Sequence, residues 1–112
     1  LGNELGKFDA VVSGFAIHHL DDARKKSLYA EILGLLEEGG VFLNLEHVAS
    51  ANAAQHQKFV ELLGGGEDPS NQLAPAWAQA QWLEQVGFAK ADVLWKWLEL
   101  ALLVGWTDPK EV

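Results

Sequence analysis

Short apolar runs rich in β-branched and aromatic residues alternate with longer amphipathic segments along the chain. The first run, residues 8–15, predicts a strand, and Gly14 allows a bend or a close backbone approach near its end. A second run, residues 41–48, is mostly apolar at its start rather than alternating, as in a strand that is covered on both faces. Since a helix of about four turns fits between them, we expect the two strands to be parallel in a right-handed β-α-β unit.

The segment between these strands has the clearest helical pattern in the sequence. Its apolar residues recur at i, i+4, i+7 and i+8 and form one stripe: Leu28, Ile32, Leu35 and Leu36. Charged residues take the positions that would face solvent: Arg24, Lys25, Lys26 and Glu31. The Asp21-Asp22 pair can cap the first turn, and Gly39-Gly40 is predicted to end the helix.

The second half of the chain predicts two more helices and a hairpin. A helix over residues 51–63 would turn three apolar side chains inward: Phe59, Val60 and Leu63. A loop with several glycines and prolines, residues 64–75, leads to a helix over residues 76–86. Residues 91–104 are rich in Val, Leu and Trp and predict two antiparallel strands that turn about residues 96–98. The expected order is β-α-β-α-α-β-β, with a partly parallel sheet, which is an α/β pattern.

Tryptophan is frequent in the predicted elements of the C-terminal half. We expect the side chains of four of them in the core: Trp77, Trp82, Trp95 and Trp97. For Trp95 and Trp97, which flank Lys96 on a predicted strand, the alternative is that they line a substrate pocket.

Length and composition fit a single folded domain over residues 1–112. The chain is 49% apolar and 21% charged, which is the composition of a globular protein. Its 16 acidic and 8 basic side chains leave a net charge of −8, the wrong sign for binding a phosphate backbone, so nucleic acid is not an expected partner. The absence of cysteine excludes disulfides and thiolate chemistry. No signal peptide and no apolar run long enough to span a bilayer is visible, so we expect a cytoplasmic protein without a membrane partner.

Four segments, in this order and spacing, resemble the second half of class I S-adenosylmethionine-dependent methyltransferases: Phe8-Asp9-Ala10-Val11-Val12-Ser13, Ile17-His18-His19-Leu20, Leu35-Leu36-Glu37-Glu38-Gly39-Gly40-Val41-Phe42 and Trp82-Leu83-Glu84-Gln85-Val86-Gly87-Phe88. The resemblance covers nearly all of residues 8–105. It implies a Rossmann-like half-domain whose strands correspond to the fourth to seventh strands of a seven-stranded, doubly wound sheet, the last of them antiparallel. One local departure is Glu38 in place of the proline that usually precedes the two glycines.

The resemblance implies S-adenosylmethionine as the cofactor and methyl transfer to a small-molecule acceptor as the function. Such enzymes bind the cofactor mainly through a glycine-rich turn after their first strand, by the logic of dinucleotide-binding folds. Here only seven residues precede strand 8–15, and the sequence has no Gly-x-Gly-x-Gly. We therefore expect about half of a cofactor site and an incomplete enzyme, a fragment of a methyltransferase. The alternative is a non-catalytic, self-associating remnant of such a domain.

Candidate site residues lie where the two parallel strands end, because ligands bind outside the carboxyl ends of the strands in open α/β sheets. The resemblance assigns five residues to the methionine and sulfonium region of the cofactor: Ser13, Gly14, Phe15, Ala16 and His18. Three further side chains would reach the same edge and could carry catalytic proton transfer: His19, Glu46 and His47. For at least one of the histidines a capping or packing role stays open. No metal site is expected, since no ligand repeat such as His-Glu-x-x-His occurs.

The outer edge of strand 8–15 is the last feature with a functional consequence. In the complete fold this strand is paired on both sides, and without its neighbour it would expose unpaired backbone groups on a largely apolar segment. We therefore expect a partner at this edge. That partner is either a second copy of the chain, in a homodimer, or the missing N-terminal half of the domain.

Overall fold

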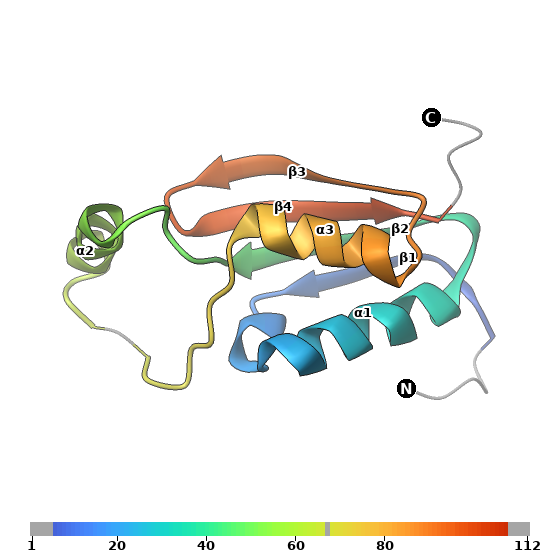
Figure 1. Cartoon of the computed structure of the whole chain (residues 1–112), viewed down its shortest axis with the longest axis horizontal. Helices are drawn as coiled ribbons and strands as arrows, with labels where there is room; N and C mark the ends of the chain where they lie inside the picture. Colours follow the sequence, from blue (N-terminus) through green and yellow to red (C-terminus); the bar gives the residue numbers. More distant parts are fainter. Residues whose placement is uncertain (1–5, 67, 108–112) are drawn as a thin grey trace.

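The computed structural model describes residues 6–66 and 68–107, and in them the strands form a single four-stranded sheet. The strand order is β1-β2-β4-β3 (Figure 1). The strands are β1 (Phe8–Gly14), β2 (Leu36–His47), β3 (Lys90–Trp97) and β4 (Leu100–Trp106). β1 and β2 are parallel, whereas β4 is antiparallel to both of its neighbours, β2 and β3. The predicted α/β fold class, with a parallel pair and an antiparallel C-terminal hairpin, is confirmed.

The helical elements of the described residues are η1, a 3-10 turn (Ile17–His19), α1 (Asp22–Leu35), α2 (Ala53–Leu62) and α3 (Ala76–Val86). α1 begins as predicted, because the Asp21 carboxylate accepts a 2.8 Å hydrogen bond from the Arg24 amide. Asn52 caps α2 in the same way by accepting from the Gln55 amide at 2.9 Å. At the end of α3, Gly87 has a φ of +125°, a conformation that favours glycine.

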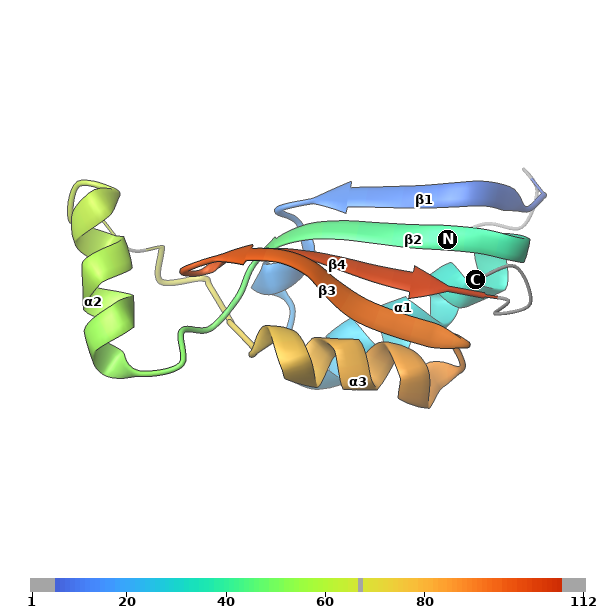
Figure 2. The same ribbon diagram turned by 90° about the horizontal axis from the view of Figure 1, so that it is seen from above.

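α1 and α3 cover one face of the sheet, and in the described part of the chain no helix covers the other face (Figure 2). The larger core cluster lies in this helix-covered layer: Ile17, Tyr29, Ile32, Leu36, Phe42, Leu83 and Phe88. The Phe42 ring lies between those of Tyr29 and Phe88, with centroid distances of 5.8 and 6.2 Å. Since burying one such side chain stabilises the fold by about 1.5–3 kcal/mol, this layer holds the helices on the sheet.

The junction between α1 and β2 differs from the sequence prediction. α1 ends at Leu35 and β2 follows at once, whereas Gly39-Gly40 was predicted to end the helix. Gly39 has a positive φ of +81°, but it lies inside β2, where the register with β1 is irregular. At Gly40, an added Cβ would lie 2.8 Å from the Glu37 carbonyl oxygen. The glycines therefore serve a bulge and a close backbone contact rather than a helix cap.

Lys25 is the clearest exception to the predicted solvent-facing side of α1. Its side chain is fully buried, and its ammonium group donates to the Gln72 carbonyl oxygen and lies 3.4 Å from the Asp22 carboxylate. The sequence pattern placed Lys25 in solvent because helical periodicity does not reveal contacts with distant segments. The loop before α3, which contains Gln72, covers this end of α1. Lys25 thereby holds the segment before α3 against α1.

Several large apolar side chains are also more exposed than predicted. Trp82 packs partly buried against the core, but Trp77, Trp95 and Trp97 are 66%, 48% and 50% exposed. In the second helix Phe59 is buried as predicted, whereas Leu63 is exposed. The core prediction is wrong for Trp77, Trp95, Trp97 and Leu63, because it assumes that both sheet faces and the whole of α2 and α3 are covered.

β1 is an edge strand of the sheet, paired only with β2 among the described strands (Figure 2). Val12 in its middle is 73% exposed, and Phe15 just beyond its end is half exposed. The helices described here include none that is long and apolar enough to cross a membrane.

Candidate functional site

Several buried or partly buried polar side chains lie at the end of the sheet where β1 and β2 finish. After β1, the backbone turns at Phe15, whose φ is +56° and whose N–H donates to the Leu45 carbonyl at 2.8 Å. The η1 turn then brings His18 back over the end of β2, and the His18 carbonyl accepts a 2.8 Å hydrogen bond from the Gln72 amide. A non-glycine residue with positive φ at such a place is a feature that recurs at functional sites.

His18 and Glu46 form a buried pair at this edge. Nδ1 of His18 lies 2.6 Å from Oε1 of Glu46, and the two residues are 7% and 0% exposed. The Glu46 carboxylate also accepts from the His47 backbone N–H at 3.1 Å and from the Asn44 side-chain amide at 3.5 Å. Because this carboxylate acts as an acceptor, the shared hydrogen resides on Nδ1 of His18. The lone pair of the imidazole is therefore on Nε2.

A second carboxylate, Glu99 in the turn between β3 and β4, binds three donors nearby. Its Oε1 lies 2.7 Å from Nε2 of His47, and its Oε2 lies 2.6 Å from Nδ1 of His56 and accepts from the Ser50 hydroxyl. Burial of Glu99 on its own would raise the pKa of the carboxyl group. The hydrogen bonds from Ser50, His47 and His56 outweigh it and hold that pKa below its ordinary value. Glu99 is thus a buried, ionised carboxylate at neutral pH.

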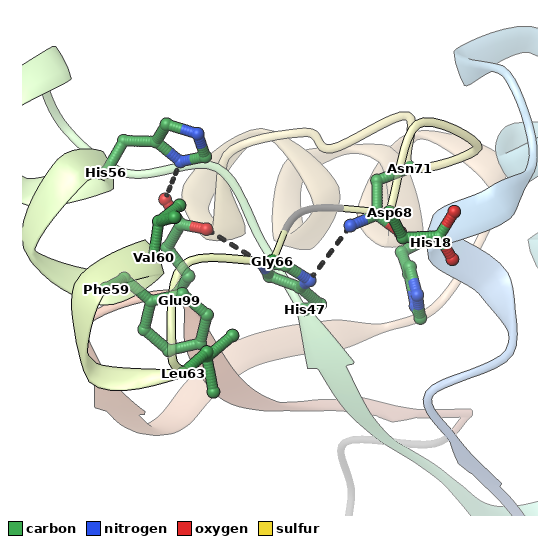
Figure 3. A pocket seen from close by; sticks show the side chains of 10 residues that line it. All are labelled: His18, His47, His56, Phe59, Val60, Leu63, Gly66, Asp68, Asn71 and Glu99. Carbon is green, nitrogen blue, oxygen red and sulfur yellow. Dashed lines mark hydrogen bonds and ion pairs between the residues drawn. The ribbon is translucent and has the colours of Figure 1, made fainter.

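A cavity of about 270 Å³ lies between these two carboxylate-histidine groups and α2. Polar side chains form one part of its wall: His18, His47, His56, Asp68, Asn71 and Glu99. Side chains of α2 and of the residue after it form the apolar part: Phe59, Val60 and Leu63. Figure 3 shows His47 between Glu99 and Asn71, whose amide nitrogen lies 3.5 Å from Nδ1 of the ring. Both nitrogens of His47 thus have partners.

Asn71 contributes a second feature to the cavity wall. Its Oδ1 atom is buried and has no hydrogen-bond partner in the described part of the chain. A buried polar atom without a partner costs about 1–3 kcal/mol, so a hydroxyl or amine of a bound molecule would find an acceptor there.

His19 lies outside the cavity, unlike its neighbour His18. Its Nδ1 is 3.0 Å from the Ser70 hydroxyl, which in turn donates to Asp68 at 2.7 Å. Hydrogen bonds from the backbone amide and the hydroxyl of Ser70 hold the pKa of the Asp68 carboxyl below its ordinary value. Of the three side chains predicted for proton transfer, Glu46 and His47 lie close together in the structure, and the partner of Glu46 is His18 rather than His19.

The four other residues predicted to contact the cofactor lie beside the open edge of the sheet. Ser13, Gly14, Phe15 and Ala16 follow one another from the end of β1, and residues 14–16 are exposed. An added Cβ at Gly14 would meet no atom within 4 Å, and its φ is outside the left-handed range, so the fold itself does not demand glycine there. The open space beside Gly14 leaves room for another molecule to approach the backbone there.

Sequence reasoning did not single out three members of the second group: Ser50, His56 and Glu99. Glu99 carried one signal, because it is a single charge within an otherwise apolar stretch. His56 and Ser50 carried none, since only the folded chain brings α2 and the end of β2 to the hairpin turn. Within residues 6–66 and 68–107, no group of three or more His, Asp or Glu side chains is arranged to hold a metal ion.

The strand order and the helices on one face are those of a class I methyltransferase-type fold, as comparison with solved structures shows. An O-methyltransferase family protein from Burkholderia thailandensis superimposes on 96% of the chain, and on 32% of its own length, with a TM-score of 0.70 and 19% identity. Human N-acetylserotonin methyltransferase in complex with SAM matches 90% of the chain and 30% of its own, with a TM-score of 0.65 and 14% identity. PigF with SAH matches 88% and 30%, with a TM-score of 0.65 and 17% identity.

These similarities confirm the fold that the sequence resemblance implied. The chain spans about a third of the length of each of these proteins. No family model matches the sequence, and no curated protein is similar enough to match it.

Proposed function

We propose that the chain is the acceptor-binding part of an S-adenosylmethionine-dependent methyltransferase that acts on the hydroxyl group of a small molecule. The observation that carries the proposal is the His18–Glu46 pair at the wall of the cavity, with a contact of 2.6 Å. A histidine whose Nδ1 is held by a carboxylate presents a basic Nε2, which is the arrangement that general-base catalysis requires. In the described part of the chain, no hydrogen bond to this Nε2 is formed.

When bound, S-adenosylmethionine would supply a methyl group on a sulfonium for direct displacement, in which the carbon–sulfur bond is lost and S-adenosylhomocysteine is the leaving group. His18 accepts the proton of the acceptor hydroxyl at Nε2, so that an oxygen electron pair forms the bond to the methyl carbon. Glu46 stabilises the imidazolium that forms and keeps its ring oriented. His47 is the weaker candidate base, because its ring nitrogens already have partners in Glu99 and Asn71.

We assign the methionine end of the cofactor to the segment after β1. Ser13, Gly14, Phe15 and Ala16 offer backbone groups there, and the space beside Gly14 is open. The glycine-rich turn expected for this fold is not in the sequence, so the rest of the cofactor site has to come from another segment of polypeptide. The edge of β1 that does not face β2 is the place where such a segment would pair, because β1 pairs only with β2 among the described strands. A second copy of the chain is the alternative occupant of this edge.

A non-catalytic, self-associating remnant is the second candidate function. The observation that favours it is the same open β1 edge combined with the lack of a Gly-x-Gly-x-Gly turn. Such a protein would keep the cavity but would not bind S-adenosylmethionine.

Calorimetric titration of the chain with S-adenosylhomocysteine separates the two candidates. Micromolar binding supports the methyltransferase and excludes the remnant, whereas no binding up to millimolar ligand favours the remnant. The variant Gly14→Val fills the open space at the end of β1 and should abolish any binding. Gly34→Val is the matched control, because Gly34 also has open space around it but lies on α1.

A further inference from the structure

α2 is held to the rest of the molecule by very few side chains. It stands at the end of the sheet and lies on neither face (Figure 2). Most of its residues are exposed, and Phe59 is its single fully buried residue. The Phe59 ring lies 5.2 Å from the His47 ring and 6.4 Å from the Trp97 ring. The position of α2 therefore depends on these ring contacts and on polar contacts of His56, one of which is with Glu99.

Glu99 joins four separate parts of the chain. Glu99 lies in the hairpin turn, His47 at the end of β2, Ser50 in the loop that follows, and His56 on α2. The turn holds Glu99 in place, because Leu98 has a φ of +52° and the Glu99 carbonyl accepts from the Val48 amide at 2.7 Å. A left-handed conformation at a leucine is strained, which indicates that the surrounding contacts over-determine this turn.

The buried carboxylate of Glu99 needs these hydrogen-bond donors to remain ionised. It has no solvent exposure, and a buried charge is tolerated only where hydrogen bonds and opposite charges replace water. Each of its oxygens accepts from at least one histidine, so one carboxylate connects β2 with α2. Removing its charge would weaken the contact between His56 and the hairpin turn, and so loosen the helix that carries the apolar wall of the cavity.

We propose that Glu99 is a positioning residue for the methyl acceptor: it holds α2 in place, so that Phe59, Val60 and Leu63 form the wall on which an apolar acceptor packs. The inference rests on the proposed function insofar as the molecule in the cavity is the methyl acceptor. Asp68 and Glu99 line the cavity with carboxylates, and Glu46 lies behind His18, so an anion is disfavoured and the molecule is a neutral, largely apolar alcohol or phenol. Its hydroxyl would meet Nε2 of His18, and a second polar group would meet Oδ1 of Asn71.

2-Naphthol is a suitable probe, because it is flat, apolar and neutral and carries one hydroxyl. We expect calorimetry to show that the chain binds 2-naphthol and that 2-naphthoate, its anionic counterpart, binds at least about tenfold more weakly. Glu99→Gln should weaken 2-naphthol binding about tenfold, since a neutral amide cannot serve all three donors and α2 is then in place for a smaller fraction of the time. Glu61→Gln is the matched control, because it makes the same chemical change on the exposed side of α2.

Hydrogen exchange of the α2 amides separates positioning from a general loss of structure. In Glu99→Gln we expect faster exchange in α2 and unchanged exchange in β2 and α1, with the difference from the unchanged chain disappearing at acid pH. Should Glu99→Gln not fold, His56→Gln removes the α2 side of the same contact and should give the same pattern.

Three results would overturn the inference: no binding of 2-naphthol to the unchanged chain, equal affinity in Glu99→Gln, or an equal loss in Glu61→Gln. Failure of the proposed function looks different. If S-adenosylhomocysteine does not bind while 2-naphthol binds in a manner that depends on Glu99, the methyl-transfer assignment is wrong and the role of Glu99 in forming the cavity stands.

Discussion

The hydroxyl of Tyr29 on α1 donates a 2.6 Å hydrogen bond to Oε1 of Gln79 on α3, and both side chains are fully buried. The amide nitrogen of Gln79 continues the chain of contacts by donating to the Ala74 carbonyl at 2.9 Å. This pair therefore joins the two helices under the sheet to the loop that closes one side of the site. It is a polar contact inside an otherwise apolar layer, so each partner depends on the other.

Tyr29→Phe removes the hydroxyl and leaves Oε1 of Gln79 buried without its donor. We expect the free energy of unfolding to fall by about 1–3 kcal/mol, the penalty for an unsatisfied buried polar group. Urea denaturation followed by circular dichroism measures it. Ser27→Ala, which removes an exposed hydroxyl on the same helix, is the control and should change stability by about 0.5 kcal/mol or less.

The same side chain predicts a dependence of stability on alkaline pH. Burial, and secondarily the negative charge of Glu46, raises the pKa of Tyr29 well above its ordinary value of 10.0. The folded state then keeps a proton that the unfolded state loses, so this contribution is complete below about pH 10 and decreases as the pH rises further. The free energy of unfolding, measured between about pH 8 and about pH 11 to span the ordinary tyrosine pKa, should fall less steeply with pH in Tyr29→Phe than in the unsubstituted chain. Parallel curves would contradict the prediction.

The His18–Glu46 pair predicts a single imidazole tautomer. Ring nitrogen shifts measured by NMR should show His18 with the hydrogen on Nδ1 and the lone pair on Nε2. In Glu46→Gln the side-chain amide can accept or donate, so we expect a mixture of tautomers and, in an assembly that transfers methyl groups, a rate about 100-fold lower. Glu61→Gln should leave the His18 spectrum unchanged. A pure Nε2–H tautomer in the unchanged chain would contradict the base assignment.

Protonation of Glu99 at acid pH should loosen α2. We call the resulting loss of protection from amide exchange the acid limb. Its pKa lies below the ordinary 4.5, because the hydrogen bonds from Ser50, His47 and His56 outweigh the effect of burial. Such a carboxylate stabilises the folded state above its unfolded pKa, and this stabilisation is lost as the pH falls through the folded value. The titratable groups that face it are His47 on β2 and His56 on α2, with the Lys96 ammonium at the neighbouring Leu98 carbonyl.

The protection factors of the α2 amides, which correct for the intrinsic pH dependence of exchange, should therefore be high at neutral pH and decrease as the pH falls below about 4.5, before those of the core strands decrease. Glu99→Gln should lack this acid limb, because the variant has no carboxylate to protonate. An acid limb of equal size in the variant would assign the effect to other groups.

The open edge of β1 predicts self-association at high concentration. Val12→Lys places a charge in the middle of the exposed edge strand, which is a recognised way of blocking strand pairing. We expect light scattering to show dimers of the unchanged chain and a shift toward monomer in Val12→Lys. Ala23→Lys, an equal change of charge on the exposed side of α1, should leave the dimer intact. A monomer at all concentrations would contradict pairing of two copies at this edge.

Periodicity along the sequence was sufficient to locate the elements. The stripe of Leu28 and Ile32, the Asp21 cap and the β-prone runs depend on neighbouring residues only, and the structure confirms each of them. Element ends were less certain, because Gly39 can serve a bulge as well as a helix cap. Burial of Lys25 could not be predicted, since its partner, the Gln72 carbonyl, is 47 residues away.

For the site, the sequence by itself determined the strand ends at which the polar side chains lie, because parallel strands end at the same edge of the sheet. Only the tertiary structure decided the pairing at that edge. The η1 turn places His18, rather than His19, beside Glu46. A hairpin turn near the end of the chain brings Glu99 to His47 and His56, which lie 52 and 43 residues earlier. Such pairings depend on the direction in which a turn points its side chains and on contacts across the fold, which spacing along the chain does not encode.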